Sequence, residues 1–160
     1  LSARAEELSL EQWIALANLV RPPGNPKAGT DPAEIFPVVD ENDHVIGTAS
    51  RADVHGNNLR HRAVHLFIFN RAGDLLLQKR SRWKDRHPNV WDSSAAGHVD
   101  ASEESYDATA ARELREELGI RSELTSVAKI PASARTGEEF IWLYRGEYEG
   151  KLELARAGIE

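Results

Sequence analysis

The 160-residue chain contains no cysteine, no methionine and no long apolar run. Without cysteine it can form no disulfide, no thiolate metal site and no cysteine nucleophile. No segment approaches the roughly eighteen apolar residues that span a bilayer, and the N-terminus lacks the basic-then-apolar layout of a signal peptide. We therefore expect a cytoplasmic protein that does not contact membranes. Because the chain begins at Leu1 rather than Met, we also expect its ends to have been processed or trimmed.

Positive charge is scarce as well, since 20 Lys and Arg face 26 Asp and Glu and leave a formal net charge of -6. General nucleic-acid binding uses a basic face to displace counterions, so we expect none here. The exception is a short basic stretch at residues 79–87, KRSRWKDRH. A chain of this length, with 41% hydrophobic and 29% charged residues, is typical of one globular domain with its own core.

The order of patterns along the chain predicts a mixed architecture. Residues 9–20 carry a capping-box pattern and predict a short helix. A segment rich in proline and glycine follows it, so we separate 1–34 as a helix and linker from a domain over 35–160.

Within this domain, residues 35–50 predict a hairpin, and residues 63–80 repeat that plan around a turn at 70–74. Two further strands are expected in 124–133 and 138–149. Strands on both sides of one central helix predict an α/β (α+β) domain with a mixed sheet.

The central helix runs from Glu104 to a closing Gly119. Ala108, Ala111, Leu114 and Leu118 recur at helical spacing and are expected to form its buried stripe. Glu113, Glu116 and Glu117 fall on another face, where like charges at i, i+3 and i+4 destabilise a helix. A divalent cation such as Mg²⁺ or Mn²⁺, which prefers oxygen ligands, would remove that penalty. Without further context, a solvated acidic face paired with Arg112 and Arg115 is the simpler interpretation.

The order of residues favours the metal site. From Glu104 through Arg112, Glu113, Leu114, Glu116, Glu117, Gly119 and Ile120 the chain resembles, without a gap, the signature box of the Nudix hydrolase family. The resemblance covers roughly residues 36–148 and implies an α/β/α sandwich. It also implies that Glu113, Glu116 and Glu117 hold divalent metals, that Glu113 is a candidate base for the attacking water, and that Arg112 and Glu104 orient the metal-binding face. Diphosphate hydrolysis needs such a site because its main problems are positioning water and neutralising phosphoryl charge.

The chain departs from the box at its start. Gly97, the glycine that opens the box and that we count among the substrate-binding residues, lies seven positions before Glu104, where the family has six. An insertion within the helix would rotate the catalytic face by about 100°. A loop insertion costs less, so we assign Glu104 rather than Glu103 to the box and place the extra residue in the preceding loop.

Residues 75–99 are similar to a Nudix subgroup that includes type I isopentenyl-diphosphate isomerases. The similarity implies that Arg80 and Lys84 meet substrate phosphates, which suits a guanidinium fork and an ammonium charge. The isomerases use a cysteine just before the box glycine, where this chain has Ala96, so isomerisation by that mechanism is disfavoured. His98 follows the glycine where the isomerases have a metal-binding histidine.

Other polar and aromatic residues are weaker candidates. His55 and His61 lie near two further ligand positions of the isomerases, but one residue closer together than there, and surface histidines are common. Glu139 aligns with an additional metal ligand of many Nudix proteins, although a charge at a strand edge explains it as well. Trp83, Trp91 and Trp142 could stack on a base or prenyl group, but packing is more common for aromatics, and Trp91 is expected in the core.

Together these features predict a Mg²⁺- or Mn²⁺-dependent hydrolase that cleaves a diphosphate linkage in a small molecule, either nucleoside diphosphate-X or a prenyl diphosphate. The alternatives are a non-catalytic Nudix-fold binding module and, less favoured, an isoprenoid diphosphate isomerase. The ending LARAGIE is short for the family, so either the C-terminus is truncated or the N-terminal helix takes over a covering role. A homodimer through that helix is compatible with the sequence.

Overall fold

The structure, a computed structural model, describes residues 33–80, 87–102 and 105–151. The expected helix at 9–20, its linker, Trp83, Lys84, Glu104 and the last nine residues lie outside this range. No helix within the described residues is long and apolar enough to cross a membrane.

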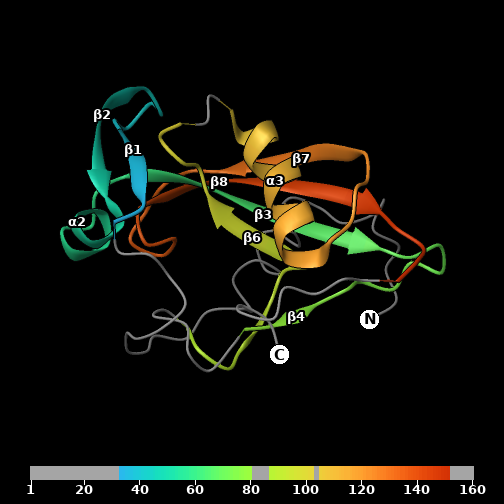
Figure 1. Cartoon of the computed structure of the whole chain (residues 1–160). Helices are drawn as coiled ribbons and strands as arrows, with labels where there is room; N and C mark the ends of the chain where they lie inside the picture. Colours follow the sequence, from blue (N-terminus) through green and yellow to red (C-terminus); the bar gives the residue numbers. More distant parts are fainter. Residues whose placement is uncertain (1–32, 81–86, 103–104, 152–160) are drawn as a thin grey trace.

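A four-stranded mixed sheet forms the centre of the molecule, in the order β6-β3-β8-β7 (Figure 1). The central strand β3 (His61–Phe69) pairs antiparallel with β6 (Ala95–His98) and parallel with β8 (Glu139–Glu147). The fourth strand, β7 (Leu124–Ile130), pairs antiparallel with β8. The prediction of a mixed sheet is thus confirmed, and the parallel β3–β8 pair brings the first residues of both strands to the same end of the sheet.

Both faces of β3 are buried, which explains its nearly unbroken apolar sequence. Its odd-numbered residues Ala63, Phe67 and Phe69 pack with side chains from β7 and β8. Its even-numbered residues, which point to the opposite face, pack under the helix α3 (Tyr106–Leu118). The sheet therefore gives the helix a rigid floor.

The boundaries of α3 follow from its caps. The Ser105 hydroxyl accepts a hydrogen bond from the Ala108 N–H at 3.1 Å, and Gly119 ends the helix in the left-handed conformation, at φ 68°. The expected burial of Ala108 and Ala111 is wrong, because both are exposed. The expected burial of Leu114 and Leu118 is confirmed, and Ala110 completes the buried stripe at four-residue spacing, with Thr109 and Glu113 beside it. The helix is thus rotated relative to the prediction, and one box glutamate faces the protein interior.

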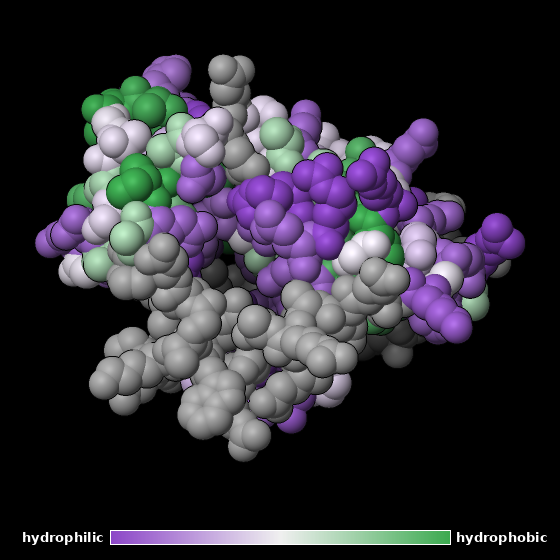
Figure 2. All heavy atoms as spheres, in the orientation of Figure 1, coloured by the Kyte–Doolittle hydropathy of each residue, from purple (hydrophilic) through white to green (hydrophobic). Residues whose placement is uncertain are grey.

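The predicted hairpin over 35–50 is confirmed as β1 (Ile35–Val39) and β2 (Val45–Ser50), which leads into the short helix α2 (Arg51–Gly56). At its turn Asp43 is 8% exposed and adopts a left-handed backbone, at φ 65°. The Asp43 carboxylate accepts hydrogen bonds from Arg62 at 2.7 Å, Tyr106 at 2.9 Å and Lys129 at 2.5 Å, and these contacts hold the hairpin against the sheet and α3. Figure 2 shows hydrophobic surface over β1 and β2, where Ile35, Val45 and Ile46 are exposed, and hydrophilic surface over α3.

The second pair of apolar strands, expected over residues 63–80, is formed only in part. The turn at 70–74 is present, with the Asn70 N–H bonded to the Asp74 carbonyl at 3.0 Å, but the following strand is reduced to β4 (Gln78–Lys79), which pairs with β5 (Trp91–Asp92). Asp92 faces inward in this small ribbon, whereas Trp91 is 58% exposed. The expectation of Trp91 as a core residue is therefore wrong, because neighbouring side chains of a strand point to opposite faces.

Candidate active site and metal centre

Three consecutive residues of β6 each contact a different part of the candidate site. The Ala96 N–H donates to the Glu117 carboxylate, Gly97 lies against Glu113, and the His98 carbonyl accepts from Arg112. Because β6 is held along β3 by its backbone hydrogen bonds, this edge strand fixes the box helix relative to the sheet. From the sequence, Gly97 had been assigned to substrate binding, and Ala96 had been given no role in the site.

Gly97 makes room for a box glutamate. A Cβ built on Gly97 would lie 1.8 Å from Oε1 of Glu113, so any larger residue would displace this carboxylate. Glu113 is 8% exposed. Burial raises the pKa of Glu113 to about 8; Arg112 opposes this shift, and the charges of Glu117 and Glu116 add to it. A proton or a cation is therefore strongly favoured at this carboxylate.

Glu117 is held from two sides. Its Oε2 accepts hydrogen bonds from the Ala96 N–H and from the Gln78 side-chain amide, each at 3.1 Å. Sequence reasoning missed Gln78, although a polar residue closing the apolar run LLLQ was an available signal. The side chain of Ala96 itself has no titratable proton.

Arg112 links the remaining box residues. Its Nη1 contacts Glu113 at 2.8 Å and Glu116 at 2.9 Å, and its Nη2 donates to the His98 carbonyl at 3.1 Å. A guanidinium thus lies between two carboxylates that would otherwise repel each other, and the orienting role of Arg112 stays a prediction.

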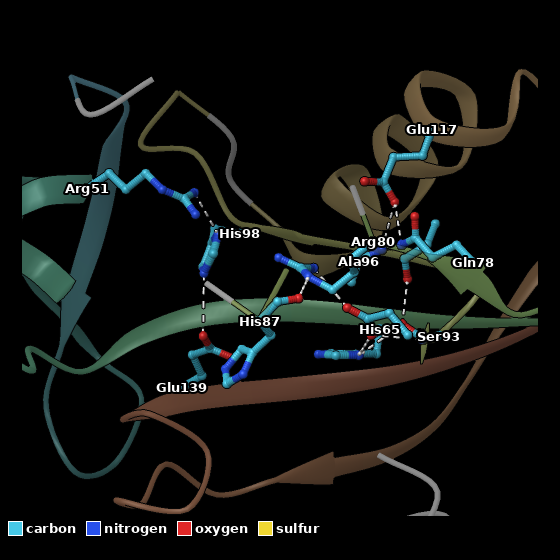
Figure 3. A network of polar contacts seen from close by, with 12 residues as sticks. Arg51, His65, Gln78, Arg80, His87, Ser93, Ala96, His98, Glu117 and Glu139 are labelled. Atoms are coloured by element: carbon cyan, nitrogen blue, oxygen red, sulfur yellow. Dashed lines mark hydrogen bonds and ion pairs between the residues drawn. The ribbon is translucent and has the colours of Figure 1, made fainter. Parts of the chain in front are cut away.

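A second group of candidate ligands lies at the end of the sheet where β3 and β8 begin. His55, His61, His98 and Glu139 each offer a ligand atom, and the four atoms lie within 4.8 Å of one another. We call this group the imidazole cluster. His98 Nε2 is 3.4 Å and His61 Nε2 is 3.7 Å from Oε1 of Glu139 (Figure 3 shows His98 and Glu139). Each residue comes from a different element, namely α2, β3, β6 and β8, so the cluster is a product of the tertiary fold.

The protonation of the cluster suits a metal ion. The Nδ1 of His61 lies 2.9 Å from the Leu59 carbonyl, which can only accept, so a neutral His61 carries its proton there and leaves a lone pair on Nε2. That Nε2 is buried and has no hydrogen-bond partner. Burial lowers the pKa of His98 to about 4, against the opposing effect of Glu139, so His98 is neutral at physiological pH. Neutral imidazoles with one carboxylate are good ligands for transition metals.

Two further residues enclose the cluster and were missed from the sequence. The Phe36 ring, which is fully buried, stacks on His98 with ring centroids 4.6 Å apart. Arg51 places Nη1 3.3 Å from Nδ1 of His98 and 3.2 Å from the Glu34 carboxylate. The only sequence signal for Arg51 was its position four residues before His55, on the same helical face.

The Arg80 side chain is held by contacts with Asp92 and His87. Its Nη1 lies 2.8 Å from Oδ2 of Asp92, and its Nε donates to the His87 carbonyl at 3.2 Å. In Figure 3, the labelled Arg80 lies between His98 and Glu139 on one side and Glu117 and Gln78 on the other. The fold therefore brings Arg80 into the same region as both candidate metal groups. Lys84 and Glu104 lie outside the described residues.

Comparison with known proteins identifies the family. The model of the Nudix domain matches residues 59–160, more than half of the chain. The chain belongs to the Nudix family, and its mixed sheet with α3 on one face is the Nudix fold.

Individual relatives carry two kinds of name. The chain is 37% identical over 127 residues to an isopentenyl-diphosphate Delta-isomerase of Serratia proteamaculans. This match covers 76% of this chain and 70% of the relative. It is 43% identical over 95 residues to an uncharacterized Nudix hydrolase of Pseudomonas aeruginosa, which covers 59% of this chain and 55% of the relative. The chain spans 53% to 70% of the length of the curated relatives that it matches first.

Among solved structures, a crystal structure of a Deinococcus radiodurans protein is similar with a TM-score of 0.70 and 28% identity. The match covers 79% of this chain and 80% of that chain.

Proposed function

We propose that this chain is a divalent-metal-dependent hydrolase that cleaves the diphosphate linkage of a small molecule, either a nucleoside diphosphate-X or a prenyl diphosphate. The observation that carries the proposal is the buried carboxylate of Glu113, lodged over Gly97 and beside Glu117. Because its pKa is raised, the ionised form of Glu113 is a stronger base toward water than an ordinary carboxylate. Ala96, at the position where the isomerases have a cysteine, provides no proton for a carbon atom.

In the proposed reaction, a water oxygen attacks phosphorus, the bond from phosphorus to the bridging oxygen breaks, and the leaving phosphate takes the electron pair. Glu113 accepts the proton of the water. Arg112 and Glu104 orient the acidic face, and Arg80, Lys84 and Gly97 line the place of the diphosphate. Mg²⁺ or Mn²⁺ held by Glu113, Glu116 and Glu117 would supply charge neutralisation at the phosphoryl oxygens.

The imidazole cluster would hold a further cation of the transition series, such as Mn²⁺. The donor set fits, since the lone pair of His61 Nε2 is buried beside the Glu139 carboxylate. Two acceptors facing each other at 3.7 Å repel unless a positive charge lies between them. In this role His55 and His61 join His98 and Glu139.

An isoprenoid isomerase is the second candidate, because relatives with that name and the imidazole cluster both favour it. A Nudix-fold binding module is the third. One experiment separates the three. The full chain is incubated with Mg²⁺ or Mn²⁺ and a panel of nucleoside diphosphate-X compounds and isopentenyl diphosphate, while released phosphate and organic products are followed together.

Metal-dependent phosphate release supports the hydrolase, double-bond migration without phosphate release supports the isomerase, and tight binding without turnover supports the module. Glu113→Gln is expected to abolish phosphate release. Unchanged release by this variant would refute the assignment of Glu113 as the base.

A further inference from the structure

A buried polar chain lies behind Arg80. Asp92, Ser93 and His65 are 5%, 1% and 7% exposed. The Asp92 Oδ1 accepts from the Ser93 N–H at 2.7 Å, and the Ser93 hydroxyl lies 3.2 Å from Oδ1 and 3.0 Å from His65 Nδ1. The other carboxylate oxygen, Oδ2, faces the Arg80 guanidinium at 2.8 Å. This carboxylate therefore connects the core of the sheet to one cationic side chain.

Asp92 is ionised in this environment. Burial on its own raises the pKa of Asp92, but the charges of His65 and Arg80 and the Ser93 N–H outweigh burial and hold it below the ordinary value. A charged carboxylate whose other oxygen is already bonded to Ser93 has one defined direction left for its partner. The orientation of Arg80 thus depends on Asp92.

The Arg80 backbone is fixed too. Its N–H donates to the Val90 carbonyl at 2.9 Å, and its carbonyl accepts from Asn89 at 3.1 Å, which extends the β4–β5 pairing by one residue. His87 and Asn89 reach this arrangement in left-handed conformations, at φ 47° and 60°. With its backbone held in the ribbon and its side chain held by Asp92 and the His87 carbonyl, Arg80 is preorganised.

We propose that Asp92 is a positioning residue that orients the Arg80 guanidinium toward the diphosphate of the substrate. The proposal rests on the phosphate-binding role of Arg80 in the proposed function. An arginine recognises phosphate through parallel N–H bonds, which require a fixed plane, whereas a lysine presents a point charge. The ion pair with Asp92 provides that plane before substrate arrives, so less conformational entropy is lost on binding.

The test is a double-mutant cycle on the full chain. Asp92→Asn, Arg80→Ala and the double variant are compared for binding of inorganic pyrophosphate with Mg²⁺ by calorimetry, and for KM and kcat on the substrate found in the panel. Asp92→Asn is expected to weaken pyrophosphate binding and raise KM about 10- to 100-fold, the worth of one charge-assisted hydrogen bond, with kcat nearly unchanged. In the Arg80→Ala background the same substitution is expected to have no further effect.

Asp74→Asn is the matched control, since it makes the same chemical change in the exposed turn after β3. Asp92→Glu, which keeps the charge, is expected to recover part of the binding and provides a second variant if Asp92→Asn fails to fold. Equal losses from Asp92→Asn with and without Arg80 would overturn the proposal, because Asp92 would then act on the fold alone. Coupling in pyrophosphate binding without turnover of any compound would instead leave this inference standing and overturn the hydrolase.

Discussion

At Gly97 the side chain is a hydrogen atom, and the Glu113 carboxylate occupies the place where a methyl group would otherwise lie. Gly97→Ala should push this carboxylate away from β6 and lower kcat/KM about 100-fold, because a displacement of about 1 Å in a catalytic group has effects of this size. The measurement is steady-state hydrolysis together with circular dichroism. Gly47→Ala is the control, since a Cβ at Gly47 meets nothing within 4 Å. Equal activity of the two variants would contradict the packing described here.

A second prediction at the scale of single residues follows from the pKa of Glu113, which is about 8. A carboxyl group whose pKa is higher in the folded than in the unfolded chain stabilises the fold fully below the unfolded value, near 4.3, and this contribution is lost as pH rises through 8. With a chelator present, wild type should therefore lose more free energy of unfolding between pH 5 and 8 than Glu113→Gln. Urea titrations at several pH values measure the difference. Other groups titrate in both proteins and cancel in the comparison, so parallel curves would show that Glu113 is not perturbed.

At the scale of elements, the β1–β2 hairpin is attached through Asp43. Burial raises the pKa of this carboxyl, but hydrogen bonds from Lys129, Arg62 and Tyr106 outweigh it and lower the pKa below its usual value. Asp43→Asn should cost about 2–4 kcal/mol in free energy of unfolding, because cationic groups lose a buried partner. Chemical denaturation measures it. Glu41→Gln in the same turn, where the side chain is exposed, is expected to change stability by less than about 0.5 kcal/mol.

The hairpin also carries Phe36, which covers His98 and His61. Loosening it through Asp43→Asn is therefore expected to weaken metal binding at the imidazole cluster as well, whereas the Glu41→Gln control leaves it unchanged. Unchanged metal affinity in both variants would mean that the hairpin has no part in shaping the cluster.

At the scale of the whole molecule, a metal in the imidazole cluster would join α2, β3, β6 and β8. Mn²⁺ at about one hundred times its Kd should then stabilise the fold by about 2.7 kcal/mol and raise Tm accordingly. His61→Ala should remove most of this rise, because it deletes a buried ligand, whereas His44→Ala, at an exposed position, should not. Thermal unfolding with and without Mn²⁺ measures both. The same rise in both variants would place the metal elsewhere.

Sequence reasoning succeeded where structure is local. The closing glycine of α3, the spacing of its glutamates and the β1–β2 hairpin all depend on residues close together in the chain, and each was predicted. It failed where a shift of one residue changes which side of a helix or strand is buried. Ala108 and Ala111 are exposed, and Trp91 is outside the core. Periodicity indicates that a buried stripe exists, but the partner surface decides which stripe it is.

The sequence alone determined the family resemblance, the acidic face of α3 and the absence of a thiol, because these are properties of residue order. Only the tertiary structure decided that His55, His61, His98 and Glu139 meet, that Gly97 makes room for Glu113, and that Asp92 holds Arg80. These contacts depend on the parallel register of His61 with Glu139 and on β6 forming the edge strand of the sheet in contact with α3. The physical reason is that strand register and packing arise from contacts between distant segments, for which the local sequence carries no signal.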